Sequence, residues 1–205
     1  MVNIYSQFLI QRYVGQEPEA RKFAGFVHQG VTRMETLIQD LLTFSRAVHR
    51  DERTFGRADL AEALDESLEV LKDRIEESDA RIVSLPLPAV RGDTAQLAHV
   101  FQNVLSNAIK YRKSGVPPVV TISAVESEIE WIVSFQDNGI GFDPQYAQRI
   151  FGLFKRLHKE EYPGTGLGLA ICQRIIERHG GRMWAEGRVG EGATFHIALP
   201  RAETL

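Results

Sequence analysis

The sequence predicts an α+β protein, in which an antiparallel helical hairpin precedes one mixed domain of helices and strands. Between Glu19 and Arg50, apolar residues recur at alternating four- and three-residue steps, as in a helix with a coiled-coil seam. A charged run that ends near Arg57 is typical of a linker, and beyond it helical and strand periods alternate. We therefore expect a hairpin at residues 1–50, a linker at 51–58 and a mixed domain at 59–205.

The hairpin is predicted to begin with a short helix over Met1 to Tyr13, and Gly15 and Pro18 supply the break and the restart. Neither helix can bury its apolar stripe alone. Pairing with a second copy into a four-helix bundle is therefore expected, with packing against the mixed domain as the alternative. The seam consists of Val27, Val31, Met34, Ile38, Leu41, Ser45 and Val48.

The mixed domain is expected to alternate capped helices with short strands. Asp59 caps the first helix, and Asp93 with Gln96 makes a capping box for the second. Gly180 and Gly181 end the last helix. The expected helices cover residues 59–78, 93–111 and 166–179, with a short helix and turn at 144–154, and the strands lie within 81–87, 119–125, 129–137, 182–186 and 193–199.

Composition excludes several classes of function. The 205 residues include 24 Lys plus Arg and 27 Asp plus Glu, and the net charge of −3 does not indicate a nucleic-acid or anionic-membrane surface. The lone cysteine, Cys172, cannot form an intrachain disulfide, which favours a reducing compartment. No stretch approaches the roughly 18 apolar residues of a membrane span, and no signal peptide is evident. We expect a cytoplasmic chain, although its parent protein could be anchored.

Two amides, an ammonium and an aromatic ring share one side of the second helix of the mixed domain, at Asn103, Asn107, Lys110 and Tyr111. Amide oxygens suit a hard cation such as magnesium, lysine suits phosphate, and an aromatic ring can stack on a base. A solvated polar face is the alternative interpretation.

An apolar strand leads into the sequence Asp137-Asn138-Gly139-Ile140-Gly141. A carboxylate there can accept a hydrogen bond from an exocyclic amine, and Gly139 and Gly141 would let a flat ring approach the backbone. Adenine carries that amine where guanine carries an oxygen, so Asp137 would select adenine. An ordinary strand-ending turn is the alternative.

A glycine-rich segment, Gly164-Thr165-Gly166-Leu167-Gly168-Leu169, opens the last helix, so its backbone N–H groups could hold a phosphate. The spacing fits neither a P-loop nor the dinucleotide fingerprint, which would follow a strand. A flexible joint is the alternative. Upstream, residues 151–156 place two aromatic anchors before two cations, as in a lid that brings Arg156 to a phosphate.

Together and in this order, these patterns resemble the ATP-binding kinase domain of sensor histidine kinases, a branch of the Bergerat-fold ATPases. The resemblance spans about residues 59–200. The asparagine helix resembles the N box, residues 137–141 the first glycine box, 151–154 the F box and 164–169 the second glycine box. Residues 161–179 are especially similar to those of bacterial phytochromes and PAS-domain sensor kinases.

The resemblance implies a two-layer sandwich, with a mixed sheet under three helices, that binds ATP and Mg²⁺. It also implies a homodimer formed through the hairpin and a response-regulator receiver domain as partner. The glycines would cradle the triphosphate. The other implied roles are magnesium ligation for Asn107 with Asn103 nearby, phosphate binding for Lys110 and Arg156, adenine contact for Tyr111 and Asp137, and support of the adenine pocket for Thr194.

One departure from the family concerns the phosphate-accepting histidine. Family members carry it in the first hairpin helix with an acidic residue directly after it, and none of the six histidines here is followed by an acidic residue. His28 lies off the seam and is expected on the solvated helix surface. The histidine box is expected upstream of Met1, unless the chain is a degenerate relative.

We therefore expect a kinase that binds Mg-ATP and phosphorylates a histidine outside this chain, without phosphorylating itself. Asn103 stands where family members that hydrolyse ATP rapidly carry a glutamate. An amide cannot take a proton, so slow ATP turnover is expected. The alternatives are a non-catalytic module that senses ATP and a dinucleotide-dependent enzyme, which the glycines and Glu186 would suit.

Overall fold

The computed structural model describes residues 18–49, 55–157, 162 and 164–201. The chain divides into two compact units, residues 1–43 and 44–205. Helix α2 (Pro18–His49) begins at a proline, which suits the first turn of a helix. The predicted helix over residues 1–13 lies outside the described residues. Within the described part of the chain, no helix is long and apolar enough to cross a membrane.

The predicted seam of α2 is mostly open to solvent in the single chain. Val31 is buried, whereas Val27, Met34, Ile38 and Leu41 are each more than half exposed. His28 is half-buried, and its Nδ1 has no hydrogen-bond partner among the described residues. His28 is therefore less exposed than the solvated surface residue that was expected.

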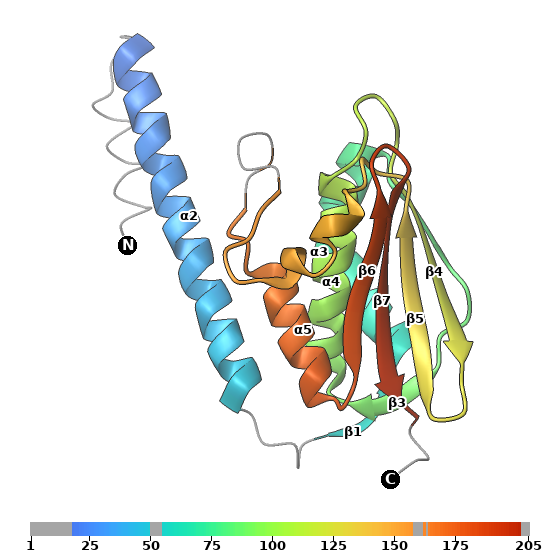
Figure 1. Ribbon diagram of the computed structural model, residues 1–205. Helices are drawn as coiled ribbons and strands as arrows, with labels where there is room; N and C mark the ends of the chain where they lie inside the picture. Colours follow the sequence, from blue (N-terminus) through green and yellow to red (C-terminus); the bar gives the residue numbers. More distant parts are fainter. Residues whose placement is uncertain (1–17, 50–54, 158–161, 163, 202–205) are drawn as a thin grey trace. The chain divides into compact units, whose positions relative to one another are not determined.

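The second unit is built on a five-stranded mixed sheet (Figure 1). The strand order is β2-β4-β5-β7-β6, and only the β2–β4 pair is parallel. The strands are β2 (Arg81–Ser84), β4 (Val119–Glu126), β5 (Glu130–Asp137), β6 (Arg182–Arg188) and β7 (Gly192–Pro200).

Three helices cover one face of this sheet, as Figure 1 shows: α3 (Leu60–Ser78), α4 (Thr94–Lys110) and α5 (Gly168–Arg178). Alternate strand residues point into the core, and the ring of Phe135 on β5 meets that of Phe101 on α4 edge-on at 4.9 Å between centroids. The layered architecture of a mixed sheet under three helices is thus confirmed.

Side-chain caps start two of these helices where the sequence predicts them. Asp59 accepts a hydrogen bond from the Ala61 N–H at 2.8 Å, and Asp93 accepts one from the Gln96 N–H at 3.1 Å. The reciprocal bond of a capping box is replaced, because the Asp93 N–H donates to His179 Nε2 at 3.1 Å. The start of α4 is therefore tied to the end of α5.

Two strands depart from the expectations. β1 (Gly56–Asp59) pairs antiparallel with β3 (Ala89–Gly92), so residues 56–58 form a strand where a linker was predicted. Each strand has only four residues, too few for an alternating pattern to stand out. The expected short helix at 144–154 consists of two 3₁₀ turns, η2 (Pro144–Tyr146) and η3 (Arg149–Phe151).

Candidate functional site

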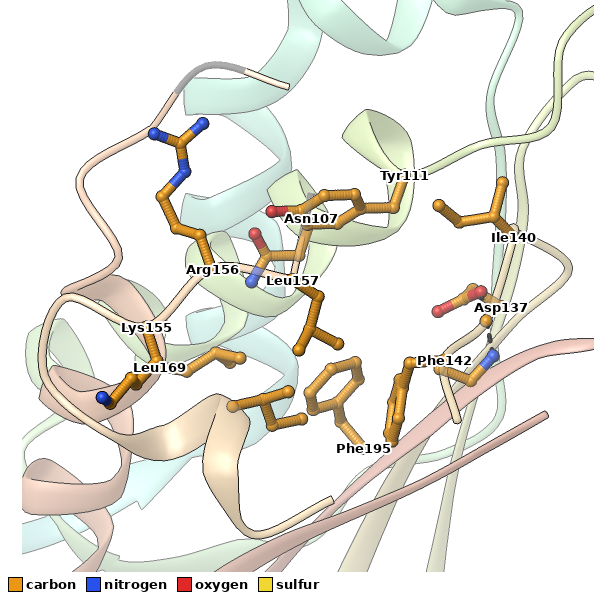
Figure 2. A pocket seen from close by; sticks show the side chains of 13 residues that line it. Asn107, Tyr111, Asp137, Ile140, Phe142, Lys155, Arg156, Leu157, Leu169 and Phe195 are labelled. Carbon is orange, nitrogen blue, oxygen red and sulfur yellow. Dashed lines mark hydrogen bonds between the residues drawn. The ribbon is translucent and has the colours of Figure 1, made fainter. Parts of the chain in front are cut away.

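A cleft of about 100 Å³ lies between α4, the ends of β5 and β7, and the segment that leads into α5. Figure 2 shows Asp137 and Ile140 at one side of the cleft and Lys155 and Arg156 at the other. The lining residues are Asn107, Tyr111, Asp137, Ile140, Gly141, Phe142, Ile150, Lys155, Arg156, Leu157, Leu169, Ala193 and Phe195.

Helix α4 contributes the asparagine stripe. Asn107 and Tyr111 line the cleft, and Asn103 lies one turn earlier. The Nδ2 of Asn103 lies 3.1 Å from both the Nε2 and the carbonyl oxygen of His99. Its Oδ1 faces Gly168 so closely that a β-carbon on Gly168 would overlap it. The asparagine stripe thus meets the first residue of α5.

Lys110 lies at the cationic side of the cleft, which we define by Lys110, Lys155 and Arg156. Its Nζ donates to the Tyr111 hydroxyl at 3.1 Å, and in Figure 2 that hydroxyl points toward the side where Arg156 lies. Burial, together with the positive charges of Arg156 and Arg74, lowers the pKa of Lys110 from 10.5 to about 8. An anion bound here would offset the repulsion among these cations.

Asp137 ends β5 at the other side of the cleft. Its Oδ1 accepts hydrogen bonds from the backbone N–H groups of Gly139 at 2.8 Å and Ala193 at 3.1 Å. Its Oδ2 accepts none from the described residues. Burial raises the pKa of the Asp137 carboxyl, and the two N–H bonds and the charge of Lys113 oppose that rise. This carboxylate is fixed by one oxygen and can accept a ligand N–H with the other.

The loop after Asp137 packs against the end of α4. The Ile140 N–H donates to the Tyr111 carbonyl at 2.9 Å, and a β-carbon on Gly139 would lie 2.6 Å from that carbonyl oxygen. Gly141 has φ +64, and a β-carbon there would overlap the Arg188 carbonyl. Glycine is needed at both positions for the backbone to form this floor of the cleft.

Apolar side chains form the walls between Asp137 and the cations. Such walls suit the flat faces of a heteroaromatic ring. Only Leu169 among them was predicted as a site residue. The alternation of β7 could have revealed Phe195, because it shares a sheet face with the buried Ile197. The walls consist of Ile140, Phe142, Ile150, Leu157, Leu169 and Phe195.

The glycine-rich segment runs directly into the N-terminus of α5. The Leu167 N–H donates to Thr165 Oγ1 at 3.3 Å, and the Leu167 side chain is buried. No side chain of the described residues caps α5, so its first N–H groups can bind an anion. A β-carbon on Gly164 would lie 3.0 Å from Lys110 Nζ, which places this segment beside the cationic side.

The residues before that segment also contact the site. A β-carbon on Gly166 would lie 2.9 Å from the Phe154 backbone, so the glycine segment packs on the end of the F-box region. Arg156 lines the cleft and donates from Nη2 to the Tyr162 carbonyl. The ring of Tyr162 lies 4.9 Å from that of Tyr111. Lys155 lines the cleft as well, although it was not predicted as a site residue.

Thr194 does not line the cleft. Side chains alternate along β7, so its neighbours Ala193 and Phe195 face the cleft while Thr194 lines a separate hollow with Glu186. Thr194 shares that hollow with Asp137, so its support of the adenine pocket stays a prediction. Glu186 lies in the same hollow, away from the glycine segment.

Among the described residues, no group of three His, Cys, Asp or Glu side chains could hold a metal ion. Magnesium bound beside phosphates commonly takes one or two protein oxygens and completes its shell with phosphate and water. The Asn107 amide in the cleft fits that mode of binding.

A mixed sheet under three helices, with a cleft between an asparagine-bearing helix and glycine loops, defines an ATP-binding domain of the Bergerat type. The chain belongs to the family of histidine kinase-, DNA gyrase B-, and HSP90-like ATPases, which matches residues 92–203.

Its relatives are phytochromes and sensor histidine kinases. Cyanobacterial phytochrome A of Nostoc sp. is 46% identical over 198 residues, which cover 96% of this chain and 26% of that protein. Full-length ShkA, solved in complex with AMPPNP, aligns with a TM-score of 0.74 and 26% identity over 98% of this chain and 42% of its own. Histidine kinase ThkA, solved in complex with response regulator protein TrrA, shares the fold with a TM-score of 0.69 and 21% identity over 98% of this chain and 57% of its own. The chain spans about a quarter of the length of the phytochrome relatives it matches.

Proposed function

We propose that the chain is the catalytic, ATP-binding part of a two-component sensor histidine kinase. It binds Mg-ATP and transfers the γ-phosphoryl group to a histidine outside this chain, from which a response-regulator aspartate receives it. The observation that carries the proposal is the polarity of the cleft, with the Asp137 carboxylate at one side, apolar walls, and Lys155 and Arg156 at the other. An adenine nucleotide presents an amine, a flat ring and phosphates in that order.

Recognition of adenine rests on Asp137. Its Oδ2 can accept the exocyclic N–H of adenine, while Oδ1 stays bound to Gly139 and Ala193. Guanine would place its carbonyl oxygen against this half-buried carboxylate. Neither that oxygen nor Asp137 Oδ2 would then have a hydrogen-bond donor. Tyr111 lies above the same region and supplies an aromatic edge or face to the ring.

Phosphate binding rests on Lys110, Arg156 and the backbone at the start of α5. Lys110 and Arg156 act on one another as like charges, and a polyphosphate between them would relieve that repulsion. The amide oxygens of Asn107 and Asn103 are the groups we assign to Mg²⁺. When bound, the ion would neutralise phosphate charge.

Phosphoryl transfer would depend on positioning and charge neutralisation rather than on a base in this chain. Among the described residues that line the cleft, Asp137 is the only carboxylate, and its Oδ1 is held at the adenine side. The Asn103 amide cannot take a proton from water, so we propose that hydrolysis is slow. Among the described residues, no histidine lines the cleft, and we propose that the acceptor is brought to it.

The exposed seam of α2 supports a homodimer. Val27, Met34, Ile38 and Leu41 leave a row of apolar side chains that a second copy would cover. The response-regulator partner is supported by the complex of ThkA with TrrA. Consumption of ATP and the buried, unpaired Cys172 support a cytoplasmic location.

A non-catalytic, ATP-sensing module is the second candidate. The observation that favours it is that none of the six histidines is followed by an acidic residue, as the family's phosphate acceptor is.

One experiment separates the two functions. The purified chain is incubated with Mg-ATP labelled in the γ-phosphate, with and without a phytochrome hairpin helix that carries the histidine box. The proposal predicts acid-labile, alkali-stable label on the added helix alone, and none when its histidine is replaced by glutamine. ATP binding without any label would favour the sensing module, and label on this chain itself would contradict the assignment of the acceptor.

A further inference from the structure

A hydrogen bond joins α3 to α4 beside the cationic side of the cleft. Arg74 Nη1 donates to Ser106 Oγ at 2.7 Å, between residues 32 apart in the sequence. Arg74 is exposed, and no motif in the sequence points to it. The bond holds a long, otherwise mobile side chain in one position, which has an entropic cost that a surface arginine usually avoids.

The position of Ser106 puts that guanidinium next to the phosphate-binding side. Ser106 directly precedes Asn107 and lies one helical turn before Lys110. Lys110 in turn contacts the Tyr111 hydroxyl and lies beside Gly164. The guanidinium of Arg74 is therefore anchored on the same two turns of α4 that carry the groups assigned to magnesium and phosphate.

Among the described residues, the charges that act on Lys110 are of one sign. Arg156 and Arg74 are the two charged groups that act on the Lys110 ammonium, and both disfavour its protonated form. Lys110 on α4 is thus repelled by one cation from α3 and by another from the segment before α5. A ligand with several negative charges would turn this repulsion into attraction.

The terminal phosphoryl group of ATP is the part of the nucleotide farthest from adenine and carries the most negative charge. With adenine at Asp137, the phosphates would extend toward Lys110 and Arg156, and α3 packs beside α4 (Figure 1). ADP lacks the terminal group and would not reach as far. An anchored arginine at this place can therefore distinguish a triphosphate from a diphosphate.

We propose that Arg74 is a specificity-determining residue that contacts the terminal phosphoryl group of bound ATP, with Ser106 holding its guanidinium in place. This inference rests on the proposed function, because it takes the ligand to be an adenine nucleotide. It adds to that function a residue from α3, outside all four sequence motifs, and a role in retaining ATP over ADP.

The test compares the affinities of the full chain for Mg-ATP and Mg-ADP by titration calorimetry at pH 7. Arg74→Gln is expected to weaken ATP binding by about fivefold to tenfold and to leave ADP binding within about twofold, since only one charge-assisted contact is lost. Ser106→Ala is expected to produce a smaller change of the same kind. Lys72→Gln removes a neighbouring exposed cation from the same helix and is the matched control, with no change in the ratio of the two affinities.

The two proposals fail differently. If Arg74→Gln leaves the ATP-to-ADP ratio unchanged, or weakens both nucleotides equally while its melting temperature matches that of the unmodified chain, the role of Arg74 is overturned and the proposed function stands. If Lys72→Gln lowers the ratio as much as Arg74→Gln, the effect is general surface charge and the role is also overturned. If the unmodified chain binds neither nucleotide, both proposals fall.

Discussion

Asn103 on α4 and Gly168 at the start of α5 approach so closely that a β-carbon on the glycine would overlap the asparagine Oδ1. The two residues belong to different motifs and lie 65 positions apart in the sequence. Their contact joins the asparagine stripe to the glycine-rich segment and sets the distance between the groups assigned to magnesium and those assigned to phosphate. It exists only because residue 168 has no side chain.

Gly168→Ala is expected to weaken Mg-ATP binding by at least about tenfold, because the added methyl group must displace the Asn103 amide or the start of α5. Calorimetric titration would measure the loss, and the melting temperature would report any general destabilisation. Gly56→Ala is the control, since a β-carbon on Gly56 would meet nothing within 4 Å. Equal affinities for the Gly168 variant and the unmodified chain would show that this contact does not shape the site.

Nucleotide binding is expected to take up protons near pH 8. The pKa of Lys110 is about 8 without ligand, so at that pH about half of the molecules carry a neutral amine. A bound triphosphate favours the charged form and raises this pKa. The affinity should therefore fall as the pH rises through 8, with an uptake of about half a proton per ATP at pH 8.

Titrations at pH 8 in two buffers of different ionisation enthalpy would measure that uptake. Lys110→Arg should abolish it, because arginine stays protonated throughout this range. Heats that do not depend on the buffer would contradict the assignment of Lys110 to the phosphates.

His179 is expected to stabilise the domain from a position outside the cleft. Its Nε2 accepts from the Asp93 N–H at 3.1 Å, its Nδ1 bonds the Ile175 carbonyl at 2.8 Å, and its ring stacks on Phe55 at 4.3 Å between centroids. His179→Ala should lower the free energy of unfolding by about 2 to 4 kcal/mol, through a cavity and an unsatisfied N–H. The exposed Arg174→Ala on the same helix should change it by less than about 0.5 kcal/mol.

The same residue predicts a dependence on pH. Burial, opposed in part by the Ile175 carbonyl and by Asp93, lowers the pKa of His179 below 6.5 in the folded chain. The unfolded chain then binds the proton first as the pH falls, so the free energy of unfolding decreases below about pH 6.5. Denaturation between pH 7.5 and 5.5 should show a shallower slope for His179→Ala. Identical slopes would show that this histidine does not titrate between the two states.

The long elements of the fold could be predicted from the sequence because each has a strong local signal. Asp59 and Asp93 are typical N-cap residues and predict helix starts. β4 and β5 are long enough for apolar and polar residues to alternate recognisably. β1 and β3 could not be found in this way. With four residues each, they are strands only because they pair with one another across the 29 residues that separate them in the sequence.

The polar groups of the cleft were easier to predict than its walls. Asn107 and Asp137 stand in motifs whose residue types suggest a chemistry. Phe142 and Leu157 are ordinary apolar residues whose role depends on where distant segments meet. Arg74 could not be predicted as a site residue for the same reason. Its proximity to Lys110 arises from the packing of α3 on α4. Thr194 was placed by resemblance alone, and the alternation of β7 turns it away from the cleft.

The central claim is that a half-buried carboxylate selects adenine, and binding of Mg-ATP and Mg-GTP to Asp137→Asn tests it most directly. The amide can still accept from Gly139 and Ala193, so the fold should be retained, and Asp65→Asn on the exposed face of α3 is the control. We predict that the unmodified chain and the control bind ATP and not GTP, and that Asp137→Asn binds ATP more weakly by about 1 to 3 kcal/mol. Unchanged ATP affinity in Asp137→Asn, or equal binding of ATP and GTP by the unmodified chain, would contradict it.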